Sequence, residues 1–195
     1  MTYTDNGLNA MSKAFHSIIR DRITRSKYKY KERPILVNNW EATYFDFDED
    51  KLKPIVDEAK ELGIEMFVLD DGWFGHRDDD NSSLGDWNVY EKKFPQGLKH
   101  FADYVHSKDL KFGIWFEPEM ISMDSELYRS HPEYLMQVPG RQPSPSRNQY
   151  ILDMTRKDVR DDIVDQVSTI IADNDIDYVK WDMNRNLSDI YSQNL

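Results

Sequence analysis

Short apolar segments alternate with amphipathic helical segments along this chain of 195 residues. The apolar segments are 35–40, 64–69, 111–117 and 177–182, and apolar residues recur at helical spacing over 49–62, 98–105 and 159–171. Segments 64–69 and 111–117 are apolar along most of their length, which is typical of parallel strands covered on both faces. The alternation therefore predicts an α/β fold with a parallel sheet.

Residues 8–23 also carry apolar side chains at helical spacing and predict an N-terminal amphipathic helix. We expect one domain over residues 1–195, in which 1–30 form this helix and its connection and 31–195 form four strands with their helices. Residues 139–145 are rich in Pro, Gly and Ser and fit either an interdomain linker or a functional loop. The strand-like run 150–152 follows at once, which favours the loop.

The composition narrows the class of partner. A net charge of −11 argues against nucleic acid and against an anionic membrane surface, and it fits a neutral or cationic ligand. There is no cysteine, no apolar run near the roughly 20 residues of a membrane span, and no signal-peptide pattern. The five histidines lack metal-ligand spacing, so we predict a cytoplasmic protein without metal or cofactor.

Polar and aromatic side chains gather where the predicted strands end. In a barrel of parallel strands these C-terminal ends share one rim, where the chemistry of such enzymes takes place. The rim residues are Trp40, Asp70, Asp71, Trp115, Glu117 and Asp182.

The last strand places a lysine two residues before its terminal aspartate. Residues two apart on a strand point to the same face, so Lys180 and Asp182 are expected to look the same way. The ammonium would then keep the carboxylate ionised, as a nucleophile requires.

The other rim residues allow two interpretations each. Asp70 and Asp71 fit a turn, or a carboxylate pair that accepts hydrogen bonds from sugar hydroxyls, which the nearby Trp73 favours. Trp115 and Glu117 share a strand face, and they either contact a ligand or support the residues that do. Arg147, taken alone, reads as a solvated loop charge.

Four motifs, in this order, closely resemble those of the α-galactosidases of glycoside hydrolase family 36. They are Asn38–Ala42, Leu69–Phe74, Trp115–Glu119 and Lys180–Arg185. The resemblance runs from about residue 30 to the end of the sequence. Any one motif alone would be weak, whereas four in order are specific.

The resemblance implies a (β/α)₈ barrel and retaining hydrolysis of terminal α-galactosides such as melibiose and raffinose. It implies that Asp182 is the nucleophile that forms a covalent galactosyl-enzyme. The implied substrate-binding residues are Trp40, Asp70, Asp71, Trp115, Arg147 and Lys180, with Trp73, Glu117 and Asn184 as further candidates.

The chain also departs from the family. A complete barrel takes about 250 residues, so four βα units correspond to about half of a TIM (β/α)₈ barrel. The family's acid/base aspartate lies on a later strand, and the thirteen residues after Asp182 do not supply it. We therefore expect little or no hydrolysis by these residues alone. Two open sheet edges favour a homo-oligomer or a complementary half barrel as partner.

Two other functions compete. A non-catalytic carbohydrate-binding or assembly module would need no acid/base. A magnesium-dependent barrel enzyme could use Asp71, Glu117 and Asp182 as oxygen ligands and Lys180 as a general base.

Overall fold

The computed structural model describes residues 3–25 and 27–194. It contains two compact units, with the boundary between Ile35 and Leu36. The first contains α1 (Gly7–Ile18), which continues as the π-helical turn η1 (Ile19–Ile23), and a 3₁₀ turn, η2 (Lys27–Lys29). The helix predicted over 8–23 is thus confirmed, and the single domain over 1–195 stays a prediction.

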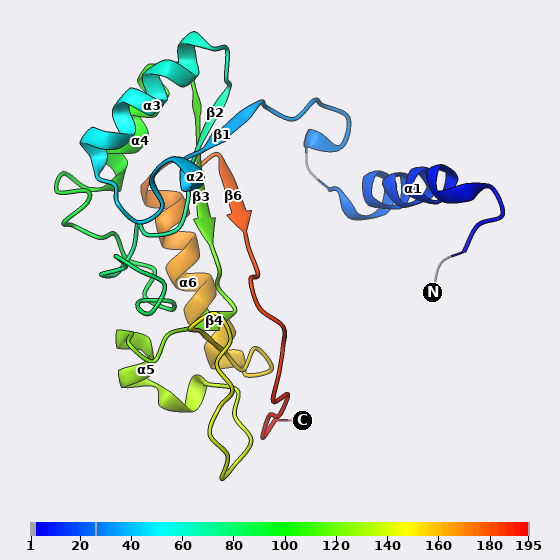
Figure 1. Ribbon diagram of the computed structural model, residues 1–195, viewed down its shortest axis with the longest axis vertical. Helices are drawn as coiled ribbons and strands as arrows, with labels where there is room; N and C mark the ends of the chain where they lie inside the picture. The colour runs from blue at the N-terminus through cyan, green and yellow to red at the C-terminus, as the bar shows by residue number, and fades with distance from the viewer. Residues whose placement is uncertain (1–2, 26, 195) are drawn as a thin grey trace. The chain divides into compact units, whose positions relative to one another are not determined.

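Within the described part of the second unit, four parallel strands form a sheet in the order β1-β2-β3-β6 (Figure 1). The strands are β1 (Leu36–Asn38), β2 (Met66–Leu69), β3 (Lys111–Phe116) and β6 (Tyr178–Trp181). The register pairs Val37 with Phe67, Val68 with Gly113, and Ile114 with Val179. The predicted α/β fold of the parallel (β/α)-barrel type is confirmed, and all four C-terminal strand ends lie at one edge.

Helices connect consecutive strands of this sheet. These are α3 (Glu49–Glu61), α4 (Leu98–Ser107) and α6 (Lys157–Asp173). Asp48 caps α3 by accepting the Lys51 backbone N–H at 2.9 Å, which satisfies one of the free donors at the helix start. Leu52 and Val56, four residues apart, are both fully buried, so α3 turns one face to the core.

The loops after the strands carry short elements of their own. A short helix, α2 (Trp40–Thr43), follows β1, and β4 (Met120–Ile121) follows β3. Next come α5 (Glu126–Ser130) and the 3₁₀ turn η3 (Pro132–Tyr134). The chain then returns through β5 (Tyr150–Ile151), which pairs antiparallel with β4. Residues 139–145 thus lie within the second unit, which favours the loop over the linker.

Much of the aromatic content is core. Trp73, Phe74, Trp87 and Phe116 are buried in one cluster with edge-on and tilted ring contacts. These buried rings contact one another and join the loop after β2 to the end of β3.

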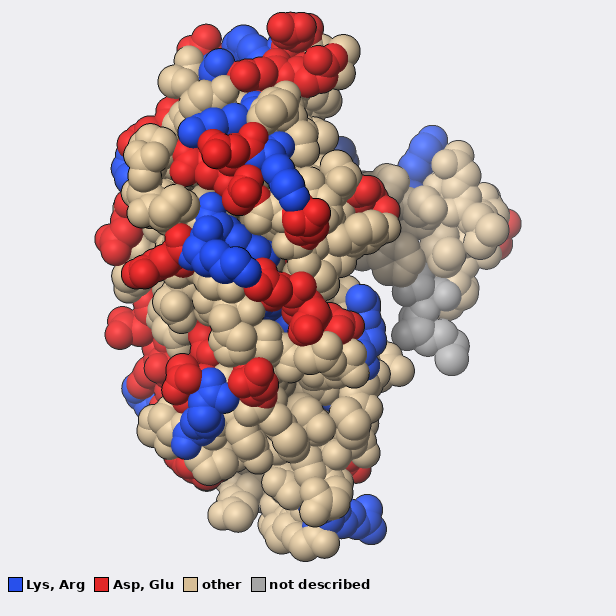
Figure 2. Space-filling model, turned by 60° about the vertical axis from the view of Figure 1, so that its left-hand side comes forward, with Lys and Arg blue, Asp and Glu red and all other residues tan. Residues whose placement is uncertain are grey.

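The surface is mixed in charge. Figure 2, turned to bring the side of α3 and α4 forward, shows acidic and basic side chains interspersed over this face. In the described part of the chain, no helix combines the length and the apolar character that crossing a bilayer requires.

Candidate active site

Asp182 directly follows β6 and is held by hydrogen bonds. Its Oδ2 accepts the Trp115 indole N–H at 2.9 Å and the Asn184 amide at 3.0 Å. Its Oδ1 accepts the Met183 backbone N–H at 3.0 Å. Burial raises the pKa of Asp182, but these bonds, together with the charge of Lys180, outweigh burial and leave its pKa below the ordinary value. Asp182 is therefore an oriented, ionised carboxylate at the C-terminal end of a strand.

Lys180 makes its ion pair with a different carboxylate from the one expected. Its Nζ donates to Asp70 Oδ2 at 2.7 Å. Its charge lowers the pKa of Asp182, but it ranks behind the hydrogen bonds. The Asn38 amide donates to the same oxygen of Asp70, whose side chain is buried. The strand period predicted the face of β6 that carries Lys180. Its partner depends on the position of β2 in the sheet, which the strand period does not give.

Glu117 and Asn184 form a second carboxylate system beside Asp182. Glu117 is 1% exposed; its Oε1 accepts the Asn184 backbone N–H at 2.6 Å and its Oε2 accepts the Asn184 amide at 3.1 Å. Burial raises the pKa of Glu117, the Asn184 bonds oppose this, and the Asp182 charge raises it further. Asn184 thus joins the two carboxylates through a single amide group.

Asp71 is paired with an arginine that the sequence analysis did not single out. Arg77 Nε donates to Asp71 Oδ1 at 2.6 Å and its Nη2 to Oδ2 at 2.9 Å, and both side chains are buried. Burial raises the pKa of Asp71, and the two-pronged contact with Arg77 opposes the rise.

A cavity of about 90 Å³ is lined by Asp71, Arg77, Glu117 and Asn184, whereas Asp70, Lys180 and Asp182 are not among its lining residues. Five predicted residues line it, and Asn184 connects it to Asp182 by hydrogen bonding. Trp40, at the start of α2, is held edge-on by Tyr44 and Phe45. The lining residues are Trp40, Phe45, Asp71, Arg77, Asp80, Glu117, Arg147, Gln149 and Asn184.

Arg147 lines this cavity, and hydrogen bonds hold its loop on both sides of Arg147. Arg185 Nη1 donates to the carbonyls of Ser144 at 3.1 Å and Gln149 at 2.6 Å. The Asn148 amide donates to Asp80 at 3.1 Å. An exposed arginine is thereby placed at the mouth of the site, as a functional loop requires.

Two predicted tryptophans lie beneath the site. Trp115 is 2% exposed and stacks on Phe74 with an interplanar angle of 13°, and its indole points to Asp182. Trp73 is fully buried, and its indole donates to the Trp115 carbonyl at 2.9 Å. In this geometry Trp115 positions Asp182 and Trp73 holds Trp115, and ligand contact by either tryptophan stays a prediction.

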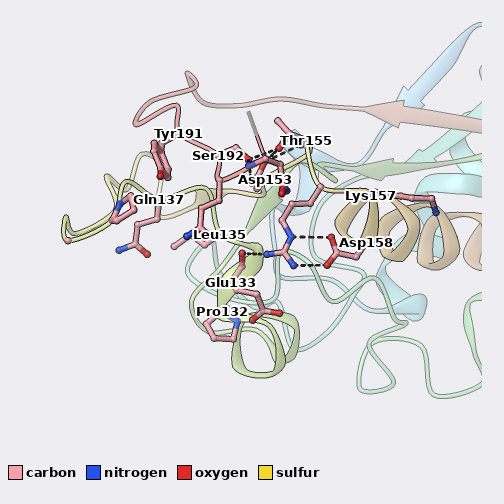
Figure 3. Close-up of a pocket in the computed structure, with 15 residues that line it drawn as sticks. Pro132, Glu133, Leu135, Gln137, Asp153, Thr155, Lys157, Asp158, Tyr191 and Ser192 are labelled. Carbon is pink, nitrogen blue, oxygen red and sulfur yellow. Dashed lines mark hydrogen bonds and ion pairs between the residues drawn. The ribbon is translucent and has the colours of Figure 1, made fainter.

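A larger hollow lies elsewhere, between η3, the start of α6 and the C-terminal segment (Figure 3). It measures about 770 Å³. Its charged groups are already paired: Arg156 with Asp158 and the Glu133 carbonyl, and Asp153 with Thr155 and Ser192 (Figure 3). The strand-end carboxylates do not line it, so the site is placed at the smaller cavity.

The magnesium alternative requires carboxylates that converge. Within residues 3–25 and 27–194, no group of three or more acidic, histidine or cysteine side chains is arranged to hold a metal ion. Arg77 pairs with Asp71, whereas the Asn184 amide bridges Glu117 and Asp182, so each carboxylate is already bound by a protein donor.

Comparison with known proteins agrees with the motifs. A family model described as Melibiase matches residues 1–195. Alpha-galactosidase Mel36A of Lactobacillus acidophilus is 71% identical over 195 residues, which are 100% of this chain and 27% of Mel36A.

Solved structures agree as well. The α-galactosidase from Lactobacillus brevis has a TM-score of 0.93 at 52% identity and is matched over 100% of this chain and 26% of its own. A variant of the family 36 α-galactosidase AgaA from Geobacillus stearothermophilus, in complex with raffinose, has a TM-score of 0.94 at 52% identity, over 100% and 27%. The chain spans about a quarter of the length of the relatives that it matches.

Proposed function

Because this chain belongs to the melibiase family, we propose that it carries the nucleophile and part of the galactosyl-binding site of a retaining α-galactosidase. The substrate class would be terminal α-galactosides of the melibiose and raffinose type. The complex of the AgaA variant with raffinose supports this choice, as does another with stachyose.

The observation that carries the proposal is the state of Asp182. A nucleophilic carboxylate must be ionised and fixed in one orientation. Three hydrogen bonds, from Trp115, Asn184 and Met183, hold it and keep its pKa below the ordinary value. In the proposed reaction an Asp182 oxygen attacks the anomeric carbon and forms a galactosyl ester while the aglycone leaves. Water then cleaves the ester, and the two inversions give net retention.

The binding groups follow from the same network. Asp70 and Asp71 would accept hydrogen bonds from galactose hydroxyls, and Lys180 would donate one while it neutralises Asp70. Trp40 would cover an apolar face of the sugar, and Arg147 would close the open side of the cavity.

A retaining mechanism also needs a carboxylic acid that protonates the leaving group, about 5–5.5 Å from the nucleophile. We assign this role to none of the 195 residues. The rate of hydrolysis by these residues alone should therefore be roughly 10²–10⁴-fold lower than the rate with a general acid in place. A non-catalytic carbohydrate-binding or assembly role stays the second candidate. Cytoplasmic location, and assembly as a homo-oligomer or with a complementary half barrel, also stay predictions.

The test separates nucleophile from binding module. The 195-residue polypeptide is incubated with 5-fluoro-α-D-galactosyl fluoride, whose leaving group needs little protonation, and is then analysed by intact and peptide mass spectrometry. We expect one 5-fluorogalactosyl group on Asp182, and no label on Asp182→Asn. Galactose binding without any label would favour the binding module, and label on another carboxylate would refute Asp182 as nucleophile. Melibiose turnover as fast as that of a complete α-galactosidase would refute the statement that these residues lack the acid/base group.

A further inference from the structure

Arg77 is a buried cation that donates two of its side-chain hydrogen bonds to Asp71. It is 2% exposed and lines the cavity next to Asp71. Besides its two bonds to Asp71, its Nη1 donates to the Ser82 carbonyl. Its guanidinium lies 5.6 Å from the ring centres of both Phe45 and Phe74. These contacts fix the orientation of the Arg77 guanidinium. The two hydrogen bonds from Arg77 fix the orientation of the Asp71 carboxylate in turn.

Lys93 holds the backbone that carries Arg77. It is 4% exposed, and its Nζ donates to three carbonyls: Phe45 at 2.9 Å, Gly72 at 2.9 Å and Arg77 at 3.0 Å. These carbonyls belong to the loop after β1 and to two points of the loop after β2. A single buried ammonium thus ties together the loops that carry Trp40, Asp71 and Arg77.

The effect on Asp71 follows from counting lone pairs. A carboxylate offers about four acceptor positions, and Arg77 occupies one on each oxygen. The Gly72 backbone N–H also hydrogen-bonds to this carboxylate, which leaves about one acceptor position free. Asp71 lines the cavity, so a ligand can reach that position. The Arg77 charge also opposes the rise in pKa that burial causes at Asp71. Because Arg77 donates to both oxygens of Asp71, a ligand hydroxyl that contacts this carboxylate is expected to donate to it.

We propose that Arg77 is a positioning residue that fixes Asp71 as an oriented hydrogen-bond acceptor for a sugar hydroxyl, and that Lys93 fixes Arg77 in turn. This inference rests on the proposed function for the identity of the sugar. The Arg77–Asp71 coupling itself does not depend on it.

The first measurement is calorimetric binding of 1-deoxygalactonojirimycin to the 195-residue polypeptide. Arg77→Lys keeps the charge but cannot form the two-pronged contact, and displacement of Asp71 by about 1 Å should weaken binding up to about 100-fold. In the double variant with Asp71→Asn, binding should fall no further than in Asp71→Asn alone, because Arg77 acts through Asp71. Arg129→Lys changes an exposed arginine on α5 that pairs with Glu126, and should leave binding unchanged.

The second measurement needs no ligand. The ¹³C signal of the Asp71 carboxylate is titrated in the wild type, in Arg77→Lys and in Lys93→Met. The pKa of Asp71 should rise in both variants, provided that circular dichroism shows them folded. Should either variant fail to fold, Lys93→Arg tests the same coupling with less loss of packing.

The outcomes are separable. Binding and titration both unaffected in Arg77→Lys would overturn the inference. Additive losses in the double variant would show that Arg77 acts independently of Asp71 and would also overturn it. A wild-type chain that binds no sugar contradicts the proposed function, and the titration then decides the Arg77–Asp71 coupling alone.

Discussion

The Lys180 ammonium on β6 lies 2.7 Å from the Asp70 carboxylate at the end of β2, across the intervening strand β3. The two residues are 110 positions apart in the sequence. Because Asp70 is buried, the pair fixes two strand ends that the sheet ladder does not join directly. The same lysine contributes charge to Asp182, so one cation serves both carboxylates.

Lys180→Met should destabilise the fold and weaken sugar binding. The substitution leaves Asp70 as a buried carboxylate with only the Asn38 amide as side-chain donor. An inadequately paired buried polar group costs about 1–3 kcal/mol, to be measured as the change in free energy of unfolding in urea. Lys99→Met is the control, because both of its partners, Asp103 and Asp175, are exposed and such surface pairs contribute about 0–1 kcal/mol each. Equal losses in both variants would contradict a special role for the Lys180–Asp70 pair.

Trp115→Phe should alter the pH dependence of labelling at Asp182. The wild-type pKa lies below the ordinary value of 3.8, so the labelling rate should fall to half of its plateau only below pH 3.8. A depressed carboxyl pKa also contributes stability above the unfolded-state pKa, which is lost as pH falls through the folded-state value. Phenylalanine keeps an aromatic ring and removes the indole N–H. The acid limb, which is the fall in labelling rate at low pH, should therefore move to higher pH.

The control for this profile is Trp87→Phe. Trp87 is as buried as Trp115, but its indole N–H has no hydrogen-bond partner within the described residues. The packing change is similar, and the acid limb should stay where it is. A shift of the limb in Trp87→Phe as large as in Trp115→Phe would mean that packing rather than the hydrogen bond sets the Asp182 pKa.

Lys92 and Lys93 show why part of the site could not be predicted from the sequence. Side by side in the sequence, their side chains are 70% and 5% exposed. No local pattern separates them, because the buried Lys93 Nζ is held by the carbonyls of Phe45 and Gly72, which are 48 and 21 positions away in the sequence. Arg77 had a weak signal: a lone arginine before an acidic run, six residues after Asp71.

The strands, by contrast, were predictable. Apolar runs bounded by polar and turn residues placed β2 and β3 within two residues of their observed bounds, and the carboxylates fell at the strand ends as expected. The facing direction of Lys180 followed from the period of two. Its partner did not, because strand order is a property of the whole sheet.

Gly113→Ala should destabilise the centre of the sheet. A Cβ at this position would lie 2.9 Å from Tyr178 Cδ1 and 3.0 Å from Val68 Cγ2. The side chains of the flanking strands β2 and β6 therefore fill the space beside residue 113, which only glycine leaves open. Overpacking of this kind costs about 1–3 kcal/mol in the free energy of unfolding. Adding Tyr178→Ala should recover part of the loss. Purely additive losses would place the strain elsewhere.

Glu117→Gln should change how stability depends on pH. Burial raises the folded-state pKa of Glu117 above the ordinary 4.5, so the folded state holds this proton more tightly than the unfolded state. Wild-type stability therefore declines as pH rises from 4.5 through the folded-state value, and the neutral glutamine lacks this decline. The altered bonds to Asn184 add a constant offset between the two proteins. In urea titrations the wild type should lose stability relative to Glu117→Gln as pH rises above 4.5. Glu126→Gln gives the control, since Arg129 lowers the pKa of Glu126 and its contribution changes only at lower pH. A constant difference between wild type and Glu117→Gln over this range would show that Glu117 is ionised as easily in the fold as in the unfolded chain.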